Sequence, residues 1–360
     1  MGPQGRVYHP VKLVTMPRPT PQQGNDAART RLLVIGAGAW GTTLAQLLAA
    51  GGHEVTVWLR DKAQADELNG SRENRRRLPG VQLDERITFS SDPITASAGA
   101  EAAFVAVPSR HVADVLDRFP PLPALISCTK GFSQDGLGRM TQVMAACQPH
   151  ARIAALSGPN LAGEIAAGKP AAAVCASVPD DAGTPLSSQV QSWLQCASFR
   201  VYTSDDVAGV EIGGALKNVI ALAAGMCHGL QLGDNTKAAI ITRGLHELVR
   251  LGTVLGGSRE TFYGLSGLGD MVATCAGPQS RNFLAGMRIA GGESAAQLES
   301  EGLTAEGIVT VQRVVAYARQ HGLDLPICRE VHAVVFEEKS PVAAIRSLME
   351  RSSKPEASVY

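Results

Sequence analysis

The chain has 360 residues, a formal net charge of zero and 45% hydrophobic residues. This length can hold two domains with sizeable cores, and the neutral charge disfavours nucleic acid as a partner. The seven cysteines form no Cys-x-x-Cys pair and the eight histidines show no metal-ligand spacing, so we expect neither a disulfide framework nor a metal site. No apolar run approaches the roughly 20 residues that span a bilayer, and a reducing cytoplasm is the expected location.

The two ends of the chain differ in composition from its middle. Residues 1–29 are rich in proline and glutamine, with neither a periodic apolar face nor the long apolar core of a secretion signal. We expect a disordered extension there and a flexible tail over residues 352–360. The sequence leaves open whether Met16 is the natural start.

A glycine-rich turn joins the first predicted strand to the first predicted helix. The strand is the apolar run 32–35, and leucines at helical spacing follow Thr42. Gly36, Gly38 and Gly41 form Gly-x-Gly-x-x-Gly, which permits a tight turn, the approach of a pyrophosphate and close packing of helix on strand. Because a helix N-terminus attracts phosphate, the motif predicts dinucleotide binding. A structural turn in another α/β protein is the alternative.

The second predicted strand, residues 53–59, ends where a ribose-reading residue is expected. Arg60 and Asp61 stand there, about 20 residues after Gly41. An acid favours the free 2′-hydroxyl of NAD, whereas an arginine can hold the 2′-phosphate of NADP. Both cofactors are therefore candidates, and a solvated Arg–Asp pair is the alternative.

Strand signals continue through the first half of the chain, separated by helical stretches. This alternation predicts a parallel, doubly wound sheet in a Rossmann-like domain over residues 30–204. The polar, arginine-rich segment 69–86 is interpreted as an exposed loop. The further predicted strands are 87–89, 102–107, 125–128, 153–156, 171–177 and 199–202.

Lys130 follows the predicted strand 125–128 closely. Ligands of doubly wound sheets bind beyond the carboxyl ends of the strands. Lys130 is therefore expected at the ligand edge, where it can meet a phosphate or a carboxylate. A solvated surface lysine is the alternative.

Residues 205–351 read as helices broken by glycine turns, which predicts an all-α second domain. Its first long helix, 207–228, is apolar almost all round and should be buried. Lysine is almost never buried without a partner, and burial lowers its pKa, so Lys217 suits proton transfer near neutral pH. A core lysine that extends to solvent is the alternative. Gly213 and Gly214 weaken the helix, so we expect a backbone or a ligand close to them.

Two further clusters carry polar side chains. Asp270 and Thr274 are four residues apart and share one helix face, although Asp270 near a helix start can also be a simple capping acid. Arg281 lies between Ser280 and Asn282, and its guanidinium can bind a phosphate bidentately. A surface turn is the alternative for these three residues.

Taken together, these stretches closely resemble the NAD(P)-dependent glycerol-3-phosphate dehydrogenases of the soluble, prokaryotic-type family. The resemblance covers about residues 31–351, and its longest stretch is 209–220, GVEIGGALKNVI. The other matching stretches are 36–42, 128–131, 157–160, 233–235, 241–244, 267–270, 280–282 and 325–327.

The resemblance implies roles for individual residues. Lys217 is implied as the catalytic acid and base, and Lys130 as a contact of both substrate and cofactor. The implied substrate-binding residues are Lys130, Gly158, Asn160, Lys217, Asn218, Asp270, Thr274, Ser280, Arg281 and Asn282. The implied cofactor-binding residues are Gly36, Gly38, Ala39, Trp40, Gly41, Arg60, Lys130, Ala162, Arg281, Thr304 and Glu306. Ala39 and Asn160 replace a usual serine or threonine, and Thr304 replaces a usual valine.

The implied reaction is reversible hydride transfer between NAD(H) or NADP(H) and C2 of dihydroxyacetone phosphate. It gives sn-glycerol 3-phosphate, which feeds glycerophospholipid synthesis. Lys217 as an ammonium would protonate the forming alkoxide and stabilise its charge, while Arg281 would anchor the phosphate. No metal, nucleic acid or membrane span is expected, and a homodimer is compatible with the resemblance.

Two other functions remain open at this point. A dehydrogenase of the same two-domain plan could act on a 2- or 3-hydroxy acid, where the anion is a carboxylate and a different sequence around Arg281 is expected. A non-catalytic NADP-binding sensor gives no reason for a lysine in a buried apolar helix.

Overall fold

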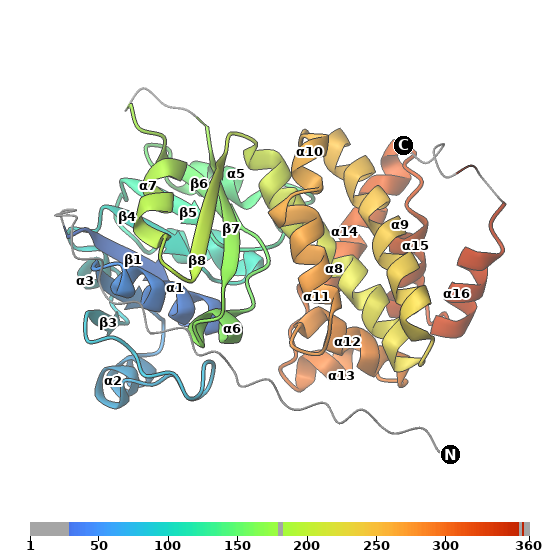
Figure 1. Cartoon of the computed structure of the whole chain (residues 1–360), viewed down its shortest axis with the longest axis horizontal. Helices are drawn as coiled ribbons and strands as arrows, with labels where there is room; N and C mark the ends of the chain where they lie inside the picture. The colour runs from blue at the N-terminus through green and yellow to red at the C-terminus, as the bar shows by residue number, and fades with distance from the viewer. Residues whose placement is uncertain (1–28, 179–182, 353–354, 356–360) are drawn as a thin grey trace, which may run out of the picture.

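The computed structural model describes residues 29–178, 183–352 and 355. An α/β part and a helical part lie side by side, drawn in blue to green and in yellow to red in Figure 1. The predictions of a disordered extension over residues 1–29 and of a flexible tail over residues 352–360 lie almost entirely outside the described residues.

The α/β part is built on one sheet of eight strands in the order β3-β2-β1-β4-β5-β6-β7-β8. The strands from β3 to β6 run parallel to their neighbours. The strands are β1 (Arg31–Ile35), β2 (Glu54–Trp58), β3 (Ile87–Ser90), β4 (Ala102–Val105), β5 (Ala124–Ser127), β6 (Arg152–Ser157), β7 (Ala171–Ser177) and β8 (Phe199–Ser204).

Alternate residues of β1 face opposite sides of the sheet and divide the core in two. Leu32 and Val34 pack in the core under α1 and α7, whereas Leu33 and Ile35 pack in the core under α4 and α5. Helices on both faces confirm the doubly wound arrangement. The helices of this part are α1 (Ala39–Ala50), α2 (Lys62–Ser71), α3 (Pro93–Ser97), η1 (Ser109–His111), α4 (Val112–Leu116), α5 (Met140–Cys147), α6 (Ala162–Ala166) and α7 (Leu186–Leu194).

The sheet reverses direction at its last two strands. β7 runs antiparallel to β6, with Ala155 opposite Ala176, and β8 runs parallel to β7. A parallel pair needs a crossover that carries the chain back across the sheet, but the connection from β6 to β7 contains only the short helix α6. The predicted parallel order therefore holds from β3 to β6, and the structure adds the reversal.

The helical part is organised around α8 (Val207–Gly229), which begins just after β8 and is buried along most of its length. By length and composition α8 could cross a membrane, but 94% of its apolar window is buried inside the protein. It packs most closely against α9 and α12. The other helices are α9 (Gly233–Val254), α10 (Arg259–Phe262), η2 (Leu265–Gly269), α11 (Asp270–Cys275), α12 (Arg281–Ala290), α13 (Ala295–Ser300), α14 (Glu306–His321), α15 (Pro326–Phe336) and α16 (Pro341–Met349).

Candidate active site

The glycine-rich turn has the local geometry that its sequence pattern predicts. Gly36 has φ +115°, a backbone conformation that side chains rarely adopt. A Cβ at Gly41 would lie 1.9 Å from the carbonyl oxygen of Gly36, so helix α1 could not approach the strand with a larger residue there. A Cβ at Gly38, in contrast, would meet nothing within 4 Å. The second glycine therefore borders open space, which fits the approach of a pyrophosphate.

Asn74 supports this turn from the arginine-rich segment, although the sequence pattern predicts an exposed loop there. Its side chain is 1% exposed, and its Nδ2 donates to the carbonyl oxygen of Ala37 at 3.0 Å and to Oγ1 of Thr42 at 2.9 Å. The prediction of an exposed loop is wrong for Asn74. An asparagine in a polar run carries no signal of burial, because the partners lie more than 30 residues away in sequence.

The other predicted cofactor contacts near this turn lie on neighbouring elements. Ala39 and Trp40 open helix α1, and Ala162 opens helix α6. The Oγ1 atom of Thr43 donates to the carbonyl oxygen of Ala162 at 3.3 Å, so α6 lies against α1. Arg60 is exposed just beyond the carboxyl end of β2.

A cavity of about 210 Å³ lies beside the start of α2, close in sequence to Arg60. Polar and charged side chains form most of its wall, so it offers hydrogen-bonding groups to a polar ligand. The lining residues are Asp61, Ala63, Gln64, Glu67, Leu68, Glu73, Asn74, Arg75 and Arg76.

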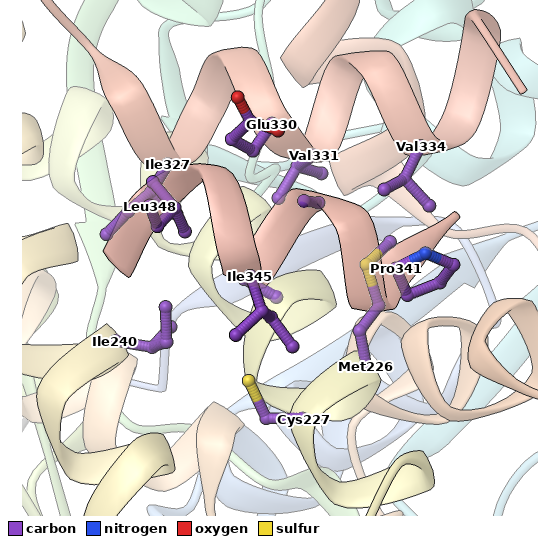
Figure 2. Close-up of a pocket in the computed structure, with 12 residues that line it drawn as sticks. Met226, Cys227, Ile240, Ile327, Glu330, Val331, Val334, Pro341, Ile345 and Leu348 are labelled. Atoms are coloured by element: carbon purple, nitrogen blue, oxygen red, sulfur yellow. The ribbon is translucent and has the colours of Figure 1, made fainter. Parts of the chain in front are cut away.

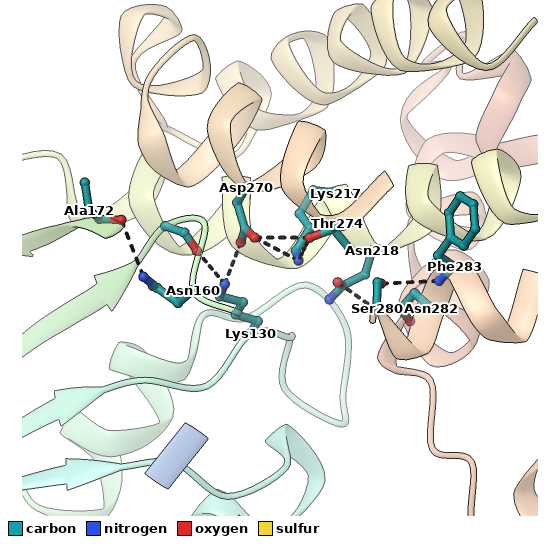
Figure 3. A network of polar contacts seen from close by, with 11 residues as sticks. Lys130, Asn160, Ala172, Lys217, Asn218, Asp270, Thr274, Ser280, Asn282 and Phe283 are labelled. Atoms are coloured by element: carbon teal, nitrogen blue, oxygen red, sulfur yellow. Dashed lines mark hydrogen bonds and ion pairs between the residues drawn. The ribbon is translucent and has the colours of Figure 1, made fainter. Parts of the chain in front are cut away.

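Lys217 lies midway along α8, with its side chain 7% exposed. Its Nζ is 3.0 Å from Oδ1 of Asp270 and forms a short hydrogen bond with Oγ1 of Thr274. Thr274 in turn donates to Asp270 at 3.1 Å, across one turn of α11. The buried lysine therefore has the acidic partner that its sequence context demands (Figure 3).

The second oxygen of Asp270 binds a second lysine. Oδ2 of Asp270 is 2.6 Å from Nζ of Lys130, which also donates to the carbonyl oxygen of Gly158 at 2.8 Å. Lys130 lies beyond the carboxyl end of β5 and Gly158 beyond that of β6. One carboxylate of the helical part thus joins a lysine of each part of the molecule, as Figure 3 shows.

Burial and the neighbouring charges shift the pKa values of Lys217 and Asp270. Burial lowers the pKa of Lys217 to about 8, although the nearby Asp270 carboxylate opposes this shift. For Asp270, burial pushes the pKa upward, but Lys130 and Lys217 outweigh burial, so its pKa lies below the usual value. Two ammonium groups and one carboxylate leave the cluster with a net positive charge.

The two glycines before Lys217 meet other segments, as their position in a buried helix predicts. A Cβ at Gly213 would lie 3.0 Å from the carbonyl oxygen of Ser266, and one at Gly214 would lie 2.5 Å from Oγ of Ser157. The prediction of a close backbone is confirmed at Gly213. Both contacts let α8 approach the ends of β6 and η2, where the partners of Lys217 are held.

A second polar cluster lies directly beside the first. Nδ2 of Asn282 donates to Oδ1 of Asn218, the residue after Lys217, at 2.9 Å. Oδ1 of Asn282 accepts from the backbone N–H of Gly307 at 2.8 Å. Ser280 caps helix α12 and accepts from the N–H of Phe283 at 3.3 Å. These hydrogen bonds within the protein therefore fix the side chains of Asn218, Ser280 and Asn282.

Arg281 differs from its two neighbours because its side chain is exposed, whereas Ser280 and Asn282 are buried. It is the first residue of α12. The cap formed by Ser280 and the buried amide of Asn282 fix the backbone on both sides of Arg281. The guanidinium is therefore carried on a rigid helix start and is accessible to a ligand.

Two buried polar atoms near Lys130 have no hydrogen-bond partner among the described residues: Oγ of Ser157 and Oδ1 of Asn160. The amide nitrogen of Asn160 donates to the carbonyl oxygen of Ala172 at 3.4 Å. Buried polar atoms are rarely left unpaired, so these two oxygens mark a place where a polar ligand can bind. Gly158 lies between them with φ +142°.

Glu306, at the start of α14, connects the helical part to the sheet edge. Its Oε2 accepts from Oγ of Ser109, just beyond β4, at 3.2 Å. Thr304 lies two residues earlier and is partly buried. Ser109 follows the predicted strand 102–107, so the sequence places it at the ligand edge of the sheet. The sequence carries no signal for its contact with Glu306.

A separate cavity of about 30 Å³ lies between α8, α9, α15 and α16 (Figure 2). Its wall is almost entirely apolar, and the one charged residue in it, Glu330, is 2.6 Å from Nζ of Lys339. It contains none of the predicted site residues. Among the described residues, no group of three or more histidine, cysteine, aspartate or glutamate side chains could hold a metal ion.

Two family models match the chain. Residues 31–182 match the N-terminal model of NAD-dependent glycerol-3-phosphate dehydrogenase, and residues 206–346 match its C-terminal model. Residues 183–205, which contain α7 and β8, lie between the two matches, and the second match begins one residue before α8, the first helix of the helical part.

Curated relatives are similar over nearly the whole chain. The glycerol-3-phosphate dehydrogenase (NAD(P)+) of Thermus thermophilus is 47% identical over 328 residues, which cover 91% of this chain and 100% of the relative. The enzyme of the same name from Deinococcus radiodurans is 48% identical over 325 residues, 90% of this chain and 96% of the relative.

Solved structures show the same similarity. The glycerol-3-phosphate dehydrogenase of Coxiella burnetii superposes with a TM-score of 0.84 at 34% identity, covering 90% of this chain and 99% of that one. The glycerol-3-phosphate dehydrogenase of Saccharomyces cerevisiae has a TM-score of 0.77 at 26% identity, covering 90% of this chain and 100% of that one.

Proposed function

Because the chain belongs to the NAD-dependent glycerol-3-phosphate dehydrogenase family, we propose that it reversibly reduces dihydroxyacetone phosphate to sn-glycerol 3-phosphate with NAD(P)H. The observation that carries the proposal is the buried Lys217–Asp270–Lys130 cluster at the junction of the sheet and the helical part. The family assignment disfavours a hydroxy acid as the substrate. A protein that only sensed NADP would not need a buried lysine paired with an acid.

Lys217 is the proposed proton donor for reduction. Its ammonium is shielded from solvent. In such a site a charged donor stabilises a forming alkoxide more strongly than it does in water. A pKa of about 8 lets the same group give a proton in one direction and take it back in the other. Asp270 and Thr274 hold the ammonium in place.

The glycine-rich turn is the proposed cofactor site. The open space at Gly38 and the start of helix α1 fit a pyrophosphate, with Gly36, Ala39, Trp40 and Gly41 around it. Ala162, Arg60, Thr304 and Glu306 are proposed to contact the rest of the cofactor. When bound, the nicotinamide supplies the hydride that reduces the substrate carbonyl. The protein's task is to hold C2 of the substrate beside the ammonium of Lys217.

The phosphate of the substrate is proposed to bind at the start of α12. Arg281 offers a bidentate guanidinium, and Ser280, Asn282 and Asn218 lie around it. The unpaired oxygens near Gly158 and Asn160, with Lys130 between the two parts, complete the proposed substrate site. Binding energy from the phosphate would align the carbonyl with Lys217.

Some finer features belong to the same proposal. Arg60 favours NADP(H), and the polar cavity beside α2 offers Arg75 and Arg76 as further cationic groups there.

The product would feed glycerophospholipid synthesis in the cytoplasm. We propose a homodimer and catalysis that involves no metal. The domain limits proposed for this activity are residues 30–204 for the cofactor and 205–351 for the substrate and catalysis.

A cofactor-oxidation assay tests the proposal. The purified chain is mixed with NADPH or NADH and with dihydroxyacetone phosphate, beside unphosphorylated dihydroxyacetone at the same concentration. We expect rapid oxidation with the phosphorylated substrate only. Equal rates with both, or no oxidation with either cofactor while the protein is folded, would refute the proposed function.

A further inference from the structure

Glu211 is a buried carboxylate that the proposed chemistry does not use. It lies on α8, six residues before Lys217, and is 8% exposed. One of its oxygens accepts from the backbone N–H of Thr141 at 2.9 Å, and the other accepts a short hydrogen bond from the Thr141 hydroxyl. Both oxygens are thus used on a single residue of the α/β part.

The partner residue lies at the start of helix α5. N–H groups in the first turn of a helix have no partner within the helix, and Thr141 is the second residue of α5. The N–H of Arg139 binds Oε1 of Gln142 at 2.9 Å, but the N–H of Thr141 is satisfied from α8. Glu211 therefore caps α5 from another helix through these two hydrogen bonds.

The start of α5 is also the end of the segment that carries Lys130. This segment, residues 128–139, folds back on itself: Phe132 pairs with Arg139, and the N–H of Ser133 donates to the carbonyl oxygen of Gly138 at 2.8 Å. At its other end, the Thr129 hydroxyl donates to the carbonyl oxygen of Val107 at 2.8 Å. The sheet holds one end of the segment, and Glu211 holds the other.

Glu211 and Lys217 are rigidly connected, because both lie on the same buried helix. Any shift of α5 relative to α8 would move the Lys130 segment relative to Lys217. The two lysines share Asp270 at 2.6 and 3.0 Å, so such a shift would disturb both contacts.

We propose that Glu211 is a positioning residue, which holds the Lys130 segment in register with Lys217 by capping helix α5. The proposal rests on the proposed function, since it assigns a task in the same reaction. It predicts that loss of the cap slows turnover, while the glycine-rich turn, which Glu211 does not touch, binds cofactor as before.

The chain offers a matched control in Glu247 of α9. Glu247 is 6% exposed, and its two oxygens accept from the N–H groups of Ile327 at 2.5 Å and Cys328 at 3.0 Å at the start of α15. Burial raises the pKa of Glu211 and of Glu247 alike to about 7. The two glutamates are therefore alike in environment and in task, but the contacts of Glu247 lie within the helical part.

The experiment compares Glu211→Gln with Glu247→Gln in the full chain. For each variant we measure kcat and KM for dihydroxyacetone phosphate, the Kd for NADPH by fluorescence, and the melting temperature. We expect both variants to lose similar thermal stability. Only Glu211→Gln should lose turnover, by roughly 10- to 100-fold, which is the scale of a misplacement of about 1 Å. The Kd for NADPH should change far less than kcat, because the glycine-rich turn, which makes most of the proposed cofactor contacts, is untouched, and only the contact of Lys130 with the cofactor would move.

A second variant covers the case in which Glu211→Gln does not fold. Thr141→Val removes the hydroxyl donor but keeps the hydrogen bond from the backbone N–H of residue 141 to Glu211 and the side-chain volume. It should therefore also lower kcat, but by a smaller factor. Normal kcat in a folded Glu211→Gln or in Thr141→Val, or equal losses of kcat in the Glu211 and Glu247 variants, would overturn the proposal. A wild-type chain that does not reduce dihydroxyacetone phosphate would instead overturn the proposed function.

Discussion

Nζ of Lys217 lies 3.0 Å from Oδ1 of Asp270, and the two side chains are only 7% and 3% exposed. Burial lowers the pKa of Lys217 to about 8, and the Asp270 carboxylate offsets part of the cost of burying its ammonium. Lys130 and Lys217 hold the pKa of Asp270 below its usual value, so the carboxylate does not take the proton of Lys217. The ammonium is therefore the group of this pair that can give a proton to a substrate.

The first prediction concerns Lys217 itself. Lys217→Ala should lower kcat by at least roughly 100-fold, the low end of the range for a general acid. Lys217→Met keeps most of the volume and should lower kcat equally. It should still fold, because Asp270 keeps its contact with Lys130 at 2.6 Å. Steady-state kinetics, a melting curve and an NADPH titration check this. A folded methionine variant with near-normal kcat would show that Lys217 is only a core lysine.

The pH dependence of the two reaction directions follows from the lowered pKa of Lys217. Reduction needs the ammonium, so its kcat should fall above pH 8, by about tenfold per pH unit. Oxidation of glycerol 3-phosphate needs the neutral amine, so its kcat should rise up to pH 8 and then level off. Profiles of kcat at saturating substrate, recorded for both reaction directions between pH 6 and 10, test whether the two rates change with pH in opposite senses. If both rates rose or both fell with pH, the titrating group would not be Lys217.

Arg281 should act on the substrate and not on the fold, since its side chain is exposed. Arg281→Ala should cost roughly 2–5 kcal/mol in kcat/KM for dihydroxyacetone phosphate, the range for truncating one partner of a charge pair that is buried once the ligand is bound. The melting temperature should stay the same. Arg281→Lys keeps the charge without the bidentate geometry and should recover only part of the loss.

Unphosphorylated dihydroxyacetone supplies the control for Arg281. It has no phosphate, so its slow turnover should be nearly insensitive to the substitution. An equal loss with both substrates would indicate that Arg281 is structural or acts on the cofactor alone.

Replacing Arg60 should affect the KM values for the two cofactors differently. Arg60→Ala should raise the KM for NADPH far more than the KM for NADH, because only NADPH carries the 2′-phosphate. The kcat at saturating cofactor should change little, since Arg60 lies at the end of β2 and not in the Lys217 cluster. Equal effects on both cofactors would leave Arg60 as a solvated surface residue.

The sequence predicts the parts of this molecule that depend on local pattern. The glycine spacing at residues 36–41 predicts the first turn, and a lysine in an apolar helix predicts that Lys217 faces a cleft or an acid. Both follow from rules that act over a few residues, and the structure has both features.

Contacts between distant segments were not predictable in the same way. Asn74 is an ordinary polar residue in a polar run, and only the fold brings it to the glycine-rich turn. For Ser109 the sequence predicts a place at the ligand edge, but only the fold brings it to Glu306. The sequence also does not predict the reversal at β7, because a short apolar run has the same pattern in either direction. The roles proposed for the site residues remain predictions until the variants are measured.

The contacts of α8 with β6 also fix the length of its first turns. β8 runs opposite to β6, and its last residue, Ser204, is level with Ala155 of β6 through Ala176 of β7. Val207 packs in one cluster with Ala155 at the start of α8, and Gly214 meets Ser157 at the end of β6. The ten helical steps from Val207 to Lys217 rise about 15 Å, so these contacts set the position at which α8 presents Lys217 to Asp270. One residue inserted between Val207 and Lys217 would turn the lysine about 100° around the helix axis and carry it about 1.5 Å too far. The number of residues in this interval is therefore as constrained as the identity of Glu211, Gly213 and Gly214 within it.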